Sequence, residues 1–173
     1  MIQLTYEPAF DSFHAAFRAL RLRTILSVDK PLHRDHFRIL DYYQLFPHRI
    51  DGIRLKPEHR RYKRLGPIYE SKKPYGEQPD DRLVFDRMEP LQVTALDALA
   101  VRAYIDTEAW SRGEVIPTEK QPPDELDRRV REANANDADL EEFLGILGSE
   151  YDLSGPNGLK ARTGLLEYRQ DAV

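Results

Sequence analysis

Apolar side chains recur at three- and four-residue steps along most of this chain, which is the pattern of amphipathic helices. The clearest stripes cover residues 10–24, 34–46, 91–102 and 140–147. In the first stripe Phe10, Phe13 and Phe17 are expected to face the core, and Asp11 is expected to cap the helix that carries them. These spacings predict a mostly α fold.

A third helix is expected to open at Pro57, and a small β element is expected after the fourth helix. That helix should open at Pro90, because proline is favoured in the first turn, and should end near Ile105. Gly113 then marks a turn, and residues 114–118 have the composition of a strand. Helix, corner, strand and glycine turn are typical of the end of a winged-helix domain. The expected fold is therefore α with a small β-wing and winged-helix-like features.

Two units are predicted from the position of the best linker, Gln121-Pro122-Pro123. Residues 1–120 would form the helical, winged-helix-like domain. Residues 121–173 would form an acidic helical C-terminal extension, whose stretch 159–168 is either a terminal helix or a tail that orders on a partner.

Charge is distributed unevenly along the chain. Residues 49–73 contain nine basic and three acidic residues, whereas residues 119–173 contain seven basic and thirteen acidic residues. Such asymmetry bears on partners rather than on fold. The basic middle suits phosphates or an acidic protein, and an ordinary solvated surface is the alternative.

Several function classes are excluded or disfavoured by what the sequence lacks. There is no cysteine, so disulfide scaffolds, thiolate metal sites and cysteine nucleophiles are excluded. No apolar run approaches the roughly 18–20 residues of a membrane span, and the N-terminus does not resemble a signal peptide, so we expect a cytoplasmic protein.

Catalytic motifs are also missing. No Walker A loop, GxGxxG, GxSxG or HExxH occurs. The pair His33 and His36 has helical spacing but no recognisable third ligand, so it is a weak basis for a metal site. We expect no metal, no cofactor and no enzymatic activity.

One string resembles a known bacterial family. Residues 38–48 read RILDYYQLFPH and are followed by Ile53-Arg54-Leu55. This segment, with residues 6–11 and 85–92, is similar to the middle component of ABC-three-component (ABC-3C) systems. The resemblance covers roughly residues 4–118. It implies an accessory subunit that works beside an SMC- or Rad50-like ABC ATPase and an effector, often a nuclease, in arrangements related to Lamassu-type anti-phage and anti-plasmid defence.

Two sets of residues are candidates for contacts with such partners. The aromatic set, Tyr42, Tyr43, Leu45 and Phe46, occupies several helical faces and would either anchor an interface or pack internally. The basic set would touch DNA phosphates or an acidic protein surface, and it consists of Arg60, Arg61, Lys63, Arg64, Lys72 and Lys73.

Three functions follow from these observations. The first is an assembly subunit of an ABC-ATPase defence complex, with DNA as a candidate contact through that complex. The second is a winged-helix DNA-binding transcriptional regulator, against which the net charge of −4 counts. The third is a hydrolase or nuclease with an unrecognised site. The resemblance favours the first.

Overall fold

Capping and breaking residues set where most of the helices begin and end. The computed structural model describes residues 8–73 and 79–167. The α-helices are α1 Ser12–Arg23, α2 Arg34–Leu45, α3 Leu65–Tyr69, α4 Asp81–Val101, α5 Thr107–Ser111, α6 Asp124–Asn136, α7 Ala138–Glu150 and α8 Leu159–Thr163. The 3-10 helices are η1 Pro8–Phe10, η2 Pro47–Gly52, η3 Pro57–Arg64 and η4 Glu70–Lys72. The Asp11 carboxylate caps α1 by accepting from the His14 backbone N–H at 2.9 Å, as predicted.

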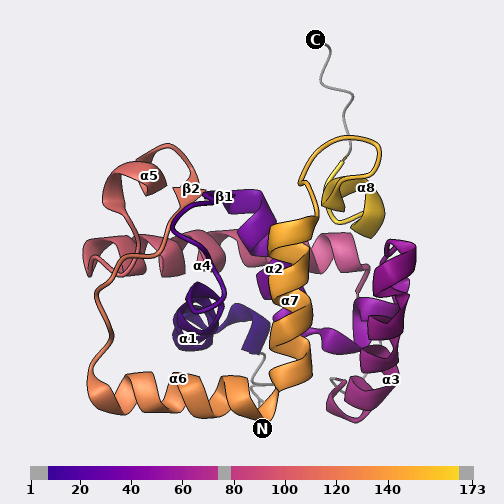
Figure 1. Ribbon diagram of the computed structural model, residues 1–173, viewed down its shortest axis with the longest axis horizontal. Helices are drawn as coiled ribbons and strands as arrows, with labels where there is room; N and C mark the ends of the chain where they lie inside the picture. Colours follow the sequence, from indigo (N-terminus) through magenta and orange to yellow (C-terminus); the bar gives the residue numbers. More distant parts are fainter. Residues whose placement is uncertain (1–7, 74–78, 168–173) are drawn as a thin grey trace, which may run out of the picture.

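The mostly α fold class is confirmed. α1 lies between α4 and α6 and packs against both, while α7 packs on α2 near the middle of the molecule (Figure 1). Buried side chains from 9 to 165 form one hydrophobic cluster, to which the segment beyond residue 121 contributes α6, α7 and α8. The division into units at residue 120 stays a prediction.

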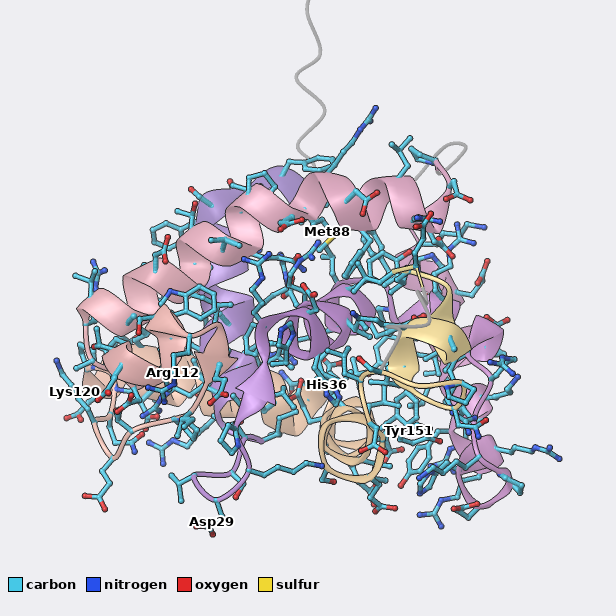
Figure 2. The ribbon with its side chains drawn as sticks, turned by 90° about the horizontal axis from the view of Figure 1, so that it is seen from above. Asp29, His36, Met88, Arg112, Lys120 and Tyr151 are labelled. Atoms are coloured by element: carbon cyan, nitrogen blue, oxygen red, sulfur yellow. The ribbon has the colours of Figure 1, made fainter. Side chains whose placement is uncertain are left out.

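The helix predicted to open at Pro90 is longer than expected. α4 begins at Asp81, and Pro90 lies inside it rather than at its start. Proline removes one backbone hydrogen bond and bends a helix, and Figure 2 shows α4 as one bent ribbon. The buried residues Phe85 and Met88, on the N-terminal side of Pro90, hold this part of the helix against the core. Packing therefore overrides the local preference for a break.

The small sheet differs from a wing. β2, Glu114–Val115, pairs antiparallel with β1, Leu32–His33, which lies far away in the sequence. An isolated bridge joins Ile105 to Pro117. Within the parts of the chain that the structure describes, no hairpin is formed by neighbouring strands after α4. The β element is thus confirmed, whereas the winged-helix detail is not.

The expectation that the first phenylalanine stripe is buried is wrong at its N-terminal end. Phe13 is 86% exposed and Phe10 is 39% exposed. Phe17 is half-buried, and only Leu20, further along α1, is fully in the core. The stripe points along one face of α1, but α4 and α6 cover only the C-terminal part of that face.

A buried polar network joins three of these helices. Arg18 on α1 pairs with Asp41 on α2 at 2.7 Å, and both side chains are buried. Gln92 on α4 donates to the other Asp41 oxygen at 2.8 Å and accepts from the Arg38 guanidinium at 2.9 Å. Each charge inside the core therefore has a partner of opposite sign or a polar amide, as burial requires.

A second buried carboxyl, that of Glu141, links α7 to α1 and α2. One of its oxygens accepts from Gln44 at 2.9 Å and from Arg21 at 3.0 Å. The other oxygen, Oε2, and the Gln44 carbonyl Oε1 are buried without a hydrogen bond among the described residues. Burial raises the pKa of Glu141, against the opposing effects of Gln44 and Arg21, and Asp137 raises it further. Protonation converts a carboxylate oxygen from an acceptor into a donor and removes the buried charge.

Stability should therefore depend on pH through Glu141. The folded chain holds this proton more tightly than the unfolded chain, so the contribution is complete below the ordinary carboxyl pKa. It is lost as the pH rises through the raised pKa. In Glu141→Gln this dependence should disappear, so the variant gains stability relative to the wild type as the pH rises. Urea unfolding between about pH 4 and 8 measures this. Glu142→Gln, at the exposed neighbouring position, is the control; equal slopes for both variants would contradict the assignment.

Candidate interaction surfaces

The basic surface is built by a 3-10 helix. η3 begins at Pro57, a favoured first position, and three residues per turn place His59, Tyr62 and Leu65 on one face. All three are buried. The four residues between them therefore point outward, and these exposed side chains are Arg60, Arg61, Lys63 and Arg64. We call this set the basic surface.

Few intramolecular contacts hold the four charges. Arg61 donates to the Tyr62 hydroxyl at 3.0 Å, and Lys63 donates to a backbone carbonyl in η2 at 3.0 Å. Arg64 forms an exposed ion pair with Asp139 at 3.4 Å, and such a pair contributes little. Arg60 makes no ion pair with a residue that the structure describes. The surface thus keeps most of its positive charge available to a partner.

The two lysines predicted to extend this set lie beyond α3. Lys73 pairs with Glu70 at 3.5 Å on the exposed side of η4. Lys72 ends η4, and its side chain lies outside the described part of the structure. Lys73 therefore has an acidic partner within its own short helix.

The sequence interpretation missed Arg162, which is connected to η3 through Tyr151. Tyr151 follows α7, and its hydroxyl is 3.0 Å from His59 Nδ1 and accepts from the Lys56 backbone N–H at 3.0 Å. The Lys56 ammonium lies 4.7 Å from the Tyr151 ring centre, and the Arg162 guanidinium lies 5.4 Å from it. Figure 2 shows Tyr151 beside α8, which carries Arg162. The spacing along the chain gives no signal of this, because Arg162 comes from the acidic segment.

The predicted aromatic set is packed inside the protein. Tyr42, Tyr43 and Phe46 are buried, and Leu45 is half-buried. The Tyr42 ring lies 5.1 Å from that of Phe46 and 6.0 Å from that of Phe85, centre to centre. Burial raises the pKa of Tyr42 and Tyr43. Of the two interpretations left open, internal packing describes this conformation, so the set lies beneath a surface rather than on one.

The histidine motif at the start of α2 is occupied by structural contacts. His33 Nδ1 accepts from the Asp35 backbone N–H at 3.1 Å and so caps α2. Asp35 pairs with Arg38 at 3.1 Å, and His36 Nε2 lies 2.8 Å from the Leu147 carbonyl. Figure 2 shows His36 between α2 and α7. Within residues 8–73 and 79–167, no group of three or more His, Asp or Glu side chains is placed to hold a metal ion.

No helix in the described ranges combines the length and the apolar character that a membrane-crossing helix needs.

Comparison with known proteins gives one match. A family model described as "ABC-three component (ABC-3C) system Middle Component 5" matches residues 4–171. No curated protein matches the chain, and no solved structure does. The matched range includes the segment beyond the linker, which the resemblance of the central motif did not cover.

Proposed function

The chain belongs to the middle component 5 family of ABC-3C systems, and from this premise we propose that it is a non-catalytic subunit that joins two larger components. Those components would be an SMC- or Rad50-like ABC ATPase and an effector, with a nuclease as the expected effector. The complex would act against phages or plasmids. The family match over nearly the whole chain is the observation that carries the proposal.

The basic surface supports this role as a contact for phosphates or for an acidic face of the ATPase. Its charges come from consecutive turns of η3 and are exposed, while the residues that fix the helix are buried. Contacts of this kind add affinity without reading sequence. A subunit that contacts DNA as part of a complex needs such affinity and does not need to recognise a sequence.

The regulator alternative has lost the feature that suggested it. β2 pairs with a strand that precedes α2, so the expected hairpin wing after α4 is not formed by the described residues. No other observation favours a sequence-specific DNA reader, and the net charge of −4 counts against one.

Co-purification tests the proposed role. An affinity-tagged chain, co-expressed with the proteins encoded beside it, should elute as a stable complex with a large ATPase and a second protein. The same tag on the chain expressed without them should recover the chain by itself. Size-exclusion chromatography with light scattering gives the composition. A chain that stays solitary beside its genomic neighbours, or turns over a substrate unaided, would refute the proposal.

A further inference from the structure

An exposed apolar surface lies where α1 begins, next to the C-terminal part of α4. Phe13 is 86% exposed, and it shares this surface with Phe17 of α1 and Leu99 of α4. Single exposed apolar residues are common, but contiguous ones mark interaction sites more often. Such a site needs a hollow between these two helices.

The hollow is present, and three helices line it. It has a volume of about 410 Å³, with Phe13 and Phe17 from α1, Leu99 from α4 and Leu126 from α6 among its walls. A second hollow of about 240 Å³ adjoins it, shares Phe13, Phe17 and Leu126, and adds Arg129. Together they form a groove along α1, which we call the α1–α6 groove.

A buried arginine fixes one wall of the groove, because it binds the backbone of the lining residue Tyr104. Arg23 at the end of α1 donates to the carbonyls of Tyr104 and Thr118, each at 2.6 Å, and also to that of Lys120. These contacts fix the segment between α4 and α6 against α1. A preformed groove avoids much of the ordering cost of binding.

The charged residues that line the groove indicate which kind of ligand it can bind. The charged side chains among the lining residues are Arg102 and Arg129, and no carboxylate lines either hollow. Arg129 is paired with Glu125 at 3.1 Å, whereas Arg102 is exposed and makes no ion pair with a described residue. A ligand that fits has an apolar face flanked by a carboxylate.

We propose that the α1–α6 groove binds an acidic amphipathic helix from another component of the same ABC-3C system; this inference rests on the proposed function. A helix laid in a groove inserts side chains three and four residues apart, which suits two adjoining apolar hollows. A second copy of this chain would bring the same arginines face to face, and like charges oppose such pairing. Nucleic acid is a poor fit, because apart from the arginines the groove offers few polar groups to phosphates, sugars or bases.

The position of the groove agrees with a joining role. Figure 1 shows the segment leading into α6, beside the groove, at one end of the longest axis, and α3, which follows the basic surface, at the other. Two partners can therefore bind this chain without competing for space.

Photo-crosslinking in the assembled complex tests the proposal. The chain carrying Phe13→p-benzoylphenylalanine is co-expressed with the other components, irradiated, and the crosslinked peptide is sequenced. We expect a peptide from another component with apolar residues at helical spacing and flanking Asp or Glu. Phe13→Ser should weaken assembly by roughly 10-fold or more, as loss of an interface anchor does. Arg102→Glu should weaken it too, and a lysine in place of the facing carboxylate should restore it.

Val28→Ser is the matched control, because Val28 is 60% exposed and lies outside the groove. Assembly that is equally strong with Phe13→Ser and Val28→Ser would overturn the groove proposal and leave the proposed function standing. Crosslinks to a second copy, to DNA or to nothing in an intact complex would also overturn it. If the wild-type chain forms no complex at all, the proposed function fails and the groove proposal fails with it.

Discussion

Replacing Asp41 with alanine should lower the free energy of unfolding by about 3–5 kcal/mol, the cost of leaving a buried charge without its partner. Asp41 is 2% exposed and accepts from Arg18 and Gln92. Its loss strands the Arg18 guanidinium between α1 and α2. Because small domains are stable by only about 5–15 kcal/mol, this loss is a large share of the total stability. Urea unfolding followed by circular dichroism measures the change.

An exposed ion pair provides the comparison. Arg128 on α6 pairs with Glu125 at 2.7 Å and with Glu132 at 3.0 Å, in full contact with solvent. Arg128→Ala should change stability little, because water screens such pairs. If Asp41→Ala were as mild as Arg128→Ala, the network joining the three helices would not be a determinant of the fold.

Reversing the charge of the basic surface should abolish its contacts while the fold survives. The variant carries Arg60→Glu, Arg61→Glu, Lys63→Glu and Arg64→Glu, all at exposed positions of η3. If these residues meet DNA phosphates, DNA-stimulated activity of the complex should be lost. The slope of log affinity against log salt should then flatten by about 0.9 for each lost contact. If they meet an acidic protein surface, assembly should be lost instead.

The control for this variant changes basic residues elsewhere on the surface. Arg87→Glu on α4 and Arg112→Glu after α5 are also exposed and should leave both readouts unchanged. Circular dichroism and the melting temperature establish that the four-fold variant is folded. Unchanged assembly together with unchanged DNA stimulation would mean that the basic surface has no part in the proposed function.

The helices and their ends were largely predictable from local signals. The Asp11 cap, the break after α2 at Pro47 and the start of η3 at Pro57 depend on neighbouring residues alone. The exposed charges of η3 were predictable for the same reason, since apolar residues every third position leave the positions between them outside.

Features that depend on distant segments were not predictable in this way. The sequence around residue 114 suggests a strand, but nothing local shows that its partner is β1. The spacing of Phe13 is that of a core residue, yet its side chain is 86% exposed. Burial of Tyr42 depends likewise on packing with Phe85 of α4. An apolar stripe indicates which face of a helix is apolar, but it does not indicate which segment packs against that face.

The core network has a consequence for how the two ends of the molecule respond to each other. Arg18, Asp41, Gln92 and Arg38 bind α1, α2 and α4 into one block. A block that opens only as a whole exchanges its slowest amide hydrogens through global unfolding. A protein bound at η3 should therefore slow hydrogen exchange in α1 as much as in its own footprint, because it stabilises the entire folded state.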